Sequence, residues 1–132
     1  MRNDTNTTAH QVTVDPTKLD AAGHFTYTDE KGNGAYRLTV HAGHGVVWTL
    51  SPNYKAADRS KVHLFTFFPP GNSPFAGEAF HTPGSTAGTT STTVNSISTP
   101  PRDFHYCVAI MDLSETPPKV LTDDPIISHS GS

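Results

Sequence analysis

Histidine is the residue type whose abundance in this sequence points to chemistry. The chain has 132 residues, and eight of them are histidines, at positions 10, 24, 41, 44, 63, 81, 105 and 129. Imidazole is a common ligand of transition metals, and a metal site requires several ligands held close together. Because spacing along the chain does not show which histidines converge in space, they are candidate ligands without a defined site.

Two pairs of candidate ligands are close in sequence. His41 and His44 flank a glycine-containing turn and could chelate an ion weakly, although solvated turn histidines are the more common outcome. His105 and Cys107 share one face of an expected strand, where their Cα atoms would be ~6.6 Å apart, close enough to bind one ion. The alternative for this pair, and the more frequent one, is a buried thiol beside a hydrogen-bonded histidine.

No motif of a known catalytic site is present. The sequence lacks Gly-x-Ser-x-Gly, His-Glu-x-x-His and a phosphate-binding Gly-Lys-Ser/Thr loop. Cys107 has no cationic neighbour in sequence that would favour its thiolate, and Asp123 and Asp124 precede a proline, where acidic residues usually form a turn. We therefore predict that the protein is not an enzyme.

A third kind of candidate site is an apolar surface. The aromatic residues of one segment are accompanied by prolines at positions 69, 70 and 74, and they are Phe65, Phe67, Phe68, Phe75 and Phe80. Such a segment could form a binding patch. A core strand followed by a rigid loop is the alternative interpretation, and the one we favour.

Composition excludes several classes of partner. The net charge is −3, and no basic block is present that would neutralise phosphates, so nucleic acid is not an expected partner. No apolar stretch approaches the ~20 residues of a membrane-spanning helix, and the polar N-terminus does not resemble a signal peptide. With one cysteine and no internal disulfide, the sequence predicts a cytoplasmic domain held together by its core alone.

The elements that would position these side chains are predicted to be short strands. Alternating apolar residues between Gly and Pro turn signals indicate about eight of them, and no helical pattern is present. They are expected near residues 12–14, 25–27, 36–41, 46–50, 62–68, 94–97, 104–111 and 124–127. This pattern predicts an all-β, antiparallel two-sheet sandwich with Greek-key connections.

Three of these strands have a predicted place in the sheets. Residues 12–14 should form an edge strand that Asp15 and Pro16 end. Residues 25–27 and 36–41 should form a hairpin around 31–34, with positive φ angles at Gly32 and Gly34. Residues 62–68 are apolar on both faces, as expected for a central strand.

The domain organisation predicted from composition is simple. Residues 1–11 are polar and are expected to form a flexible tail, and residues 12–127 a single domain. Residues 82–93 lack any apolar side chain larger than alanine, which predicts a mobile loop within that domain. Residues 128–132 are expected to form a C-terminal tail.

Several of these segments resemble those of a known fold family. Residues 38–48 (LTVHAGHGVVW) look like the strand, glycine-containing turn and strand of cupredoxin-like domains. Residues 62–65 are similar to the aromatic strand that follows in that family, and residues 104–107 resemble its penultimate strand. Residues 124–127 look like the end of small bacterial members, many of unassigned function. The resemblance spans residues 12–127 and implies a cupredoxin-like sandwich.

The same resemblance implies a possible set of copper ligands. Copper-bearing members use a histidine of the earlier aromatic strand, then a cysteine, a second histidine and usually a methionine. His63 and Cys107 match two of these positions, and Met111 would be the axial ligand. No histidine lies between Cys107 and Met111, whose Cα atoms would be ~13 Å apart in an extended strand. The set would therefore be incomplete or atypical, with His105 as a further ligand.

Two functions follow as hypotheses. The first is a non-catalytic binding or accessory module without a cofactor, which binds a protein partner or associates with itself through a sheet edge. The second is a copper-binding or electron-transfer protein that uses His63, His105, Cys107 and Met111. Convergence of these side chains on one point would distinguish the two.

Overall fold

The structure, a computed structural model, describes residues 9–41, 45–69 and 102–129, and this part of the chain is built from strands. The prediction of an all-β protein is confirmed. The strands are β1 (Ala9–Leu19), β2 (Phe25–Thr28), β3 (Arg37–Val40), β4 (Gly45–Leu50), β5 (Val62–Phe67), β6 (Arg102–His105), β7 (Cys107–Asp112), β8 (Lys119–Asp123) and β9 (Ile126–His129). A 3-10 turn, η1 (Arg59–Lys61), precedes β5.

The strands form three small sheets, two of mixed direction and one purely antiparallel. Their orders are β2-β1-β4, β3-β9-β6 and β5-β7-β8. β1 pairs with β4 and β3 with β9 in parallel, whereas the other pairings are antiparallel. The prediction of purely antiparallel sheets is therefore wrong at two pairings. It assumed that parallel strands need helical crossovers, but here the connection from β1 to β4 contains other strands.

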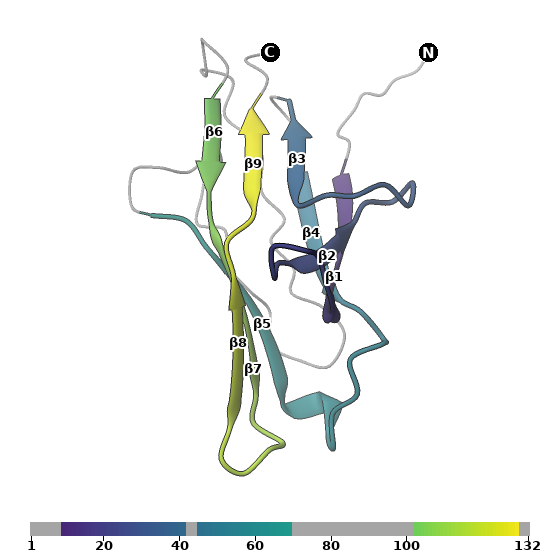
Figure 1. Cartoon of the computed structure of the whole chain (residues 1–132), viewed down its shortest axis with the longest axis vertical. Helices are drawn as coiled ribbons and strands as arrows, with labels where there is room; N and C mark the ends of the chain where they lie inside the picture. The colour runs from purple at the N-terminus through teal and green to yellow at the C-terminus, as the bar shows by residue number, and fades with distance from the viewer. Residues whose placement is uncertain (1–8, 42–44, 70–101, 130–132) are drawn as a thin grey trace.

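Two long strands change sheet at a break, which we call the kink. β6 continues into β7 past Tyr106, and β8 continues into β9 past Asp124 and Pro125 (Figure 1). The two breaks are adjacent, because the Tyr106 N–H donates to the Pro125 carbonyl oxygen at 3.1 Å. On one side of the kink β9 pairs with β3, and on the other side β7 pairs with β5. The strand predicted at 104–111 is therefore two strands.

The core is formed by alternate residues that the strands turn inward. In β4 the buried residues are Val46, Trp48 and Leu50, and Trp48 is completely buried. The Trp48 indole N–H donates to the Tyr106 hydroxyl at 3.1 Å, so the core is directly joined to the kink. This bond satisfies the indole N–H of a completely buried side chain.

β1 differs from its prediction. It begins at Ala9, within the predicted tail, and continues to Leu19, past Pro16. It lies between β2 and β4, not at a sheet edge. The chain accommodates Pro16 by a shift of register between Asp15 and Leu19, where the ladder with β2 is interrupted.

The predicted hairpin of residues 25–27 and 36–41 is also absent. The turn closes only with a bridge between Thr28 and Gly34, after which β3 joins β9 in another sheet. Gly32 has a φ of 84°, as predicted, but Gly34 does not have a positive φ. Glycine is thus required at Gly32, where other residues would be strained.

The last difference concerns β5, the strand apolar on both faces. Within the described strands β5 pairs only with β7, and β7 is the central strand of the sheet. Among the described strands, the second apolar face of β5 is therefore not explained by a central position. It belongs to the outer side of the β5-β7-β8 sheet, described below.

Some predictions fall on residues that the structure does not describe. These are the loop at 82–93, the strand pattern at 94–97, Phe75, Phe80, and most of the two predicted tails. The described residues contain no helix that is long and apolar enough to cross a membrane.

Candidate functional site

The β5-β7-β8 sheet has an outer side that we call the outer aromatic face. Strand register places His63 opposite Met111, Phe65 opposite Ala109 and Phe67 opposite Cys107. Residues directly opposite in an antiparallel pair project to the same side. β8 adds two residues through its register with β7. The face consists of His63, Phe65, Phe67, Cys107, Ala109, Met111, Val120 and Thr122.

Three rings form a row along β5 on this face. The rings of His63 and Phe65 are stacked with centroids 6.1 Å apart, and those of Phe65 and Phe67 with centroids 5.7 Å apart. Phe67 is 49 % exposed, and Val120 on β8 is 54 % exposed. Large apolar side chains usually occur singly on a protein surface, so a row that ends in a half-exposed Phe67 is informative.

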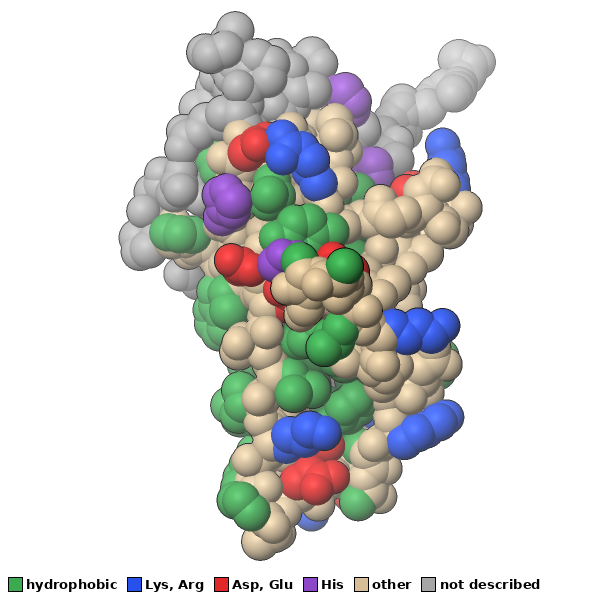
Figure 2. Space-filling model, in the orientation of Figure 1, with side chains coloured by type: hydrophobic (Ala, Val, Ile, Leu, Met, Phe, Trp, Pro, Cys, Tyr) green, Lys and Arg blue, Asp and Glu red, His purple; other side chains and the backbone are tan. Residues whose placement is uncertain are grey.

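The outer aromatic face lacks charge. None of its eight residues is Asp, Glu, Lys or Arg. Figure 2 shows hydrophobic side chains along the left side of the lower half of the molecule, over β8. Within the described part, β5 and β8 each have one strand neighbour, so an edge remains on each side of this sheet. An uncharged face of this kind fits another apolar surface.

The structure divides the proposed copper ligands into two pairs. His63 lies opposite Met111, four positions along the ladder from Cys107, which lies opposite Phe67. Four residues of strand correspond to ~13 Å, too far for one ion. His105 ends β6 and Cys107 begins β7, and both line one cavity. The four side chains therefore do not fit a single metal site with this register.

Of the other histidine pair, His41 and His44, only His41 lies within the described residues. His41 is exposed after β3, whereas His44 lies outside the described residues. The suggestion that the two chelate an ion stays a prediction.

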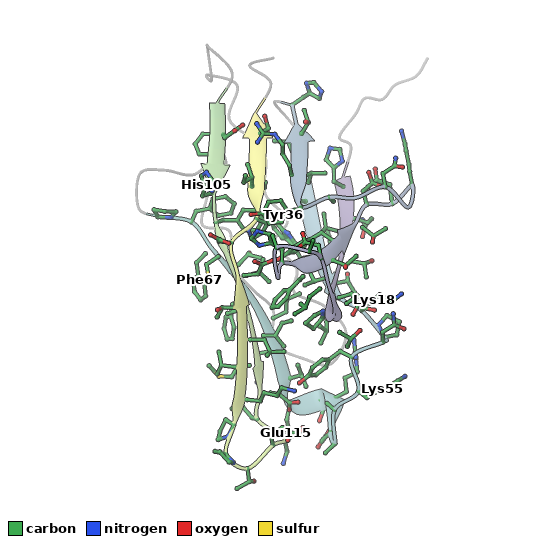
Figure 3. All side chains as sticks on the ribbon, viewed as in Figure 1. Lys18, Tyr36, Lys55, Phe67, His105 and Glu115 are labelled. Carbon is green, nitrogen blue, oxygen red and sulfur yellow. The ribbon has the colours of Figure 1, made fainter. Side chains whose placement is uncertain are left out.

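The cavity beside Cys107 has a volume of about 340 Å³. It is lined by residues 67–69 at the end of β5, residues 105–107 at the kink, and Asp124. It thus continues the outer aromatic face from Phe67 to the kink. Figure 3 shows His105 and Phe67 projecting on the same side of the molecule.

A cluster around His24 includes Asp123 and Asp124. His24 follows the turn at Asp20, whose Gly23 has a φ of 87° and requires glycine. The His24 Nδ1 atom is 2.7 Å from Asp123 Oδ1 and 3.8 Å from Asp124 Oδ1. Within the described residues this is the one group of three His, Cys, Asp or Glu side chains close enough to hold a metal ion.

Asp123 already has a partner for each oxygen. Oδ1 faces His24, and Oδ2 accepts hydrogen bonds from the Phe25 N–H at 2.9 Å and the Tyr27 hydroxyl at 2.8 Å. Burial would raise the pKa of Asp123, but the hydrogen bonds outweigh burial, and the pKa is lowered. The hydrogen bond to Asp123 in turn raises the pKa of His24.

These contacts explain the cluster as a clamp between β2 and the kink. The clamp includes Tyr36, whose ring centroid is 4.3 Å from that of His24 and whose hydroxyl donates to the Asp124 carbonyl oxygen. The sequence placed His24 among the candidate ligands but did not connect it to Asp123, from which it is 99 residues away. No signal in the sequence links residues so distant.

Cys107 lacks the environment of a reactive thiol. Burial raises its pKa, and the negative charges of Asp124 and Asp123 raise it further. Nucleophilic cysteines have the opposite, electropositive surroundings. The surroundings of Cys107 therefore favour the neutral thiol, which forms part of the cavity lining.

Comparisons with known proteins do not assign these residues. A scan against protein-family models and a search of curated proteins gave no match. We therefore base the function on the outer aromatic face, the cavity and the clamp.

Proposed function

We propose that this protein is a non-catalytic binding module that binds an apolar segment of a protein partner. The binding surface is the outer aromatic face. The observation that supports this proposal most is the stacked row of His63, Phe65 and Phe67, which ends in a half-exposed phenylalanine on an uncharged surface. Aromatic side chains on a rigid sheet bury a large area with little loss of conformational entropy.

The sheet beneath the face supports the same proposal. The opposite side of β5 and β7 is buried in the core, with Val62, Val108 and Ile110 at 0 % exposure. The backbone of the two strands is therefore held by packing on one side, while on the other side Phe67 and Val120 are about half exposed in the described part of the chain. A surface preorganised in this way loses less entropy on binding than a loop does.

As the fold of this module we propose a Greek-key sandwich of the cupredoxin-like type. Two features support it: residues 38–48 and 104–107 resemble that family, and two long strands each change sheet at the kink. Strands that switch sheets in this way are typical of β-sandwich corners.

The test is selection of binding peptides from a random library displayed on phage. We expect the peptides that bind to be rich in apolar and aromatic residues. Val120→Ser should weaken their binding at least tenfold, because it removes a half-exposed apolar side chain from the face. Affinities of synthetic peptides are then measured by calorimetry.

Leu19→Ser is the matched control. Leu19 is 59 % exposed, as accessible as Val120, but it ends β1 in another sheet. The proposal is overturned if both variants change the affinity equally, or if no peptide binds. Sedimentation of the protein without peptide measures self-association, and a stable dimer that Val120→Ser dissociates would assign the face to a second copy.

Copper binding is the second candidate. The observation in its favour is that His105 and Cys107 line one cavity and supply an imidazole and a thiol. The strand register of His63 and Met111 opposes a site made of all four residues. Copper titration followed by absorption tests it: an intense thiolate-to-copper band that Cys107→Ser removes would establish this function in place of the first.

A further inference from the structure

The clamp holds three side-chain atoms of the kinds that bind a divalent metal ion. The ligand atoms of His24, Asp123 and Asp124 all lie within 4.8 Å of one another. Imidazole nitrogen and carboxylate oxygen are both ligands of zinc in proteins, and a site with three protein ligands leaves one position for water. Figure 2 shows a histidine beside acidic side chains near the middle of the visible face.

The distances between these atoms are close to those of a zinc site. Zinc bonds to nitrogen and oxygen are about 2.0–2.2 Å long, so neighbouring ligand atoms of a tetrahedral site are ~3.4 Å apart. His24 Nδ1 is 2.7 Å from Asp123 Oδ1 and 3.8 Å from Asp124 Oδ1. Each of these two distances would change by less than ~1 Å. The ion would take the place of the proton that His24 and Asp123 share.

The ligand atoms are oriented by contacts that an ion would leave intact. The Asp123 side chain is only 6 % exposed, and its Oδ2 accepts the Phe25 N–H and the Tyr27 hydroxyl. Oδ1 is thereby directed at His24, whose ring packs against Tyr36. Metal ligands in proteins are commonly oriented by such surrounding contacts, which also raise the affinity for the metal.

The charge around the clamp is negative. Within the described ranges no lysine or arginine forms an ion pair with Asp123 or Asp124. Asp20 adds a third carboxylate: the hydrogen bond to Asp123 raises the pKa of His24, and the charges of all three carboxylates raise it further. A divalent cation would offset this charge. It can enter from solvent, since the side chains of Asp124 and His24 are 74 % and 27 % exposed.

We infer that His24, Asp123 and Asp124 bind a divalent transition-metal ion such as Zn²⁺, with water completing the coordination. Calcium and magnesium prefer six or more oxygen ligands, so an imidazole and two carboxylates suit them less well. The ion would join the turn before β2 to the kink and would stabilise the fold by binding only the folded state. This inference goes beyond the proposed function and does not depend on it.

The test is calorimetric titration of the whole protein with Zn²⁺. Bound metal is first removed with a chelator, which is then dialysed away. The titration is made at pH 8, where an ordinary imidazole is neutral and free to coordinate. We expect one ion per chain with a dissociation constant of about 1 μM, and a thermal midpoint that rises with the zinc concentration.

Two variants remove one ligand each. Asp124→Asn should weaken zinc binding at least tenfold, and its exposed position makes it compatible with folding. His24→Gln should weaken zinc binding by at least as much, because the imidazole nitrogen is lost. His10→Gln is the matched control, since His10 Nδ1 is also near a carboxylate, at 3.7 Å from Glu30, but belongs to no group of three within the described residues. It should leave the zinc affinity unchanged.

NMR of the imidazole nitrogens identifies the ligand directly. Zinc should shift the Nδ1 signal of one histidine, and this signal should be missing in His24→Gln. The inference is overturned if no ion binds, if the shifted signal persists in His24→Gln, or if Asp124→Asn keeps the wild-type affinity. Equal effects of His24→Gln and His10→Gln, or weak binding of several ions, would show that zinc binds the surface histidines without a defined site, and would also overturn it.

Discussion

The two sides of β5 and β7 are equally apolar in sequence and opposite in environment. The inner side contributes Leu64 and Ile110, whose exposures are 2 % and 0 %. The outer side contributes Phe65 and Met111, which are only partly buried, and Phe67, which is half exposed. The same two strands therefore supply both the core and the proposed binding surface.

This comparison shows that apolar residues alone do not identify core. On the inner side the apolar residues pack against Trp48 and other residues of the opposite sheet, and even the polar Asp112 is buried and accepts the Tyr54 hydroxyl at 2.6 Å. On the outer side the rings contact one another along the strand. Burial follows from what lies across the sheet, which is a property of the tertiary fold.

The difference between the inner and outer sides of β7 is tested most severely by truncating one side chain on each side. Ile110→Ala should lower the free energy of unfolding by about 2–5 kcal/mol, because it leaves a cavity in the core. Met111→Ala removes a similar side chain one residue later on the outer side, where the cost should be much smaller. Urea unfolding measures both. Similar losses for the two variants would mean that the outer side is packed as a core.

The sequence predicted the all-β character and several strand positions for a definite physical reason. Alternation of apolar residues has a period of two in any strand, so β2, β3, β4 and β5 were located near their observed bounds. The pattern does not encode which strands pair. It thus failed for the parallel pairs β1–β4 and β3–β9, whose partners are far apart in sequence.

The candidate site was predicted less completely. The aromatic residues Phe65, Phe67 and Phe68 were identified, but a core strand was preferred for them, because the sequence does not show that β5 has only one strand neighbour in the described part. The spacing placed His105 and Cys107 on one face of a single strand, whereas in the structure they belong to two successive strands and line one cavity. Asp124 joined them only through the kink, where β6–β7 and β8–β9 meet, and no local pattern predicts that contact.

Tyr106 contacts both the core and the cavity, and removing its hydroxyl changes only the contact with the core. Its hydroxyl accepts the Trp48 N–H in the core, and its ring stacks on Phe68 in the cavity. Tyr106→Phe should lower the free energy of unfolding by about 1–3 kcal/mol, because the buried Trp48 N–H loses its acceptor. Thermal and urea unfolding measure this loss.

The ring of Tyr106 remains in that variant, so its stacking on Phe68 should be retained. A variant as stable as the wild type would show that Trp48 finds another acceptor, and the core would then be less tightly joined to the kink than the bond at 3.1 Å indicates.

The clamp gives a smaller effect that depends on pH. The pKa of His24 is raised by its hydrogen bond to Asp123, so its stabilisation is present below the ordinary imidazole pKa of 6.5 and is lost as pH rises through the folded value. The pKa of Asp123 is lowered, so its stabilisation is present above 3.8 and is lost as pH falls. Both contributions are complete between these two values.

His24→Gln tests the alkaline side of this window. Unfolding is followed between pH 5.5 and 9, where wild type should lose stability with rising pH and the variant should change less. The acid side is less specific, because Asp15, Asp112 and other carboxylates also have lowered pKa values. If stability depends on pH in the same way in both proteins, the ion pair between His24 and Asp123 does not contribute to the stability of the clamp.

The smallest expected change comes from one substitution made on both sides of the sheet. Val120→Thr replaces a 54 % exposed side chain by one of the same shape, so the free energy of unfolding should stay within about 0.5 kcal/mol of wild type. Val108→Thr, at 0 % exposure, buries a hydroxyl and should cost about 1–3 kcal/mol. Because shape is conserved, urea unfolding of the pair compares hydration alone, and a substantial loss for Val120→Thr would show that the outer aromatic face is already covered within the protein.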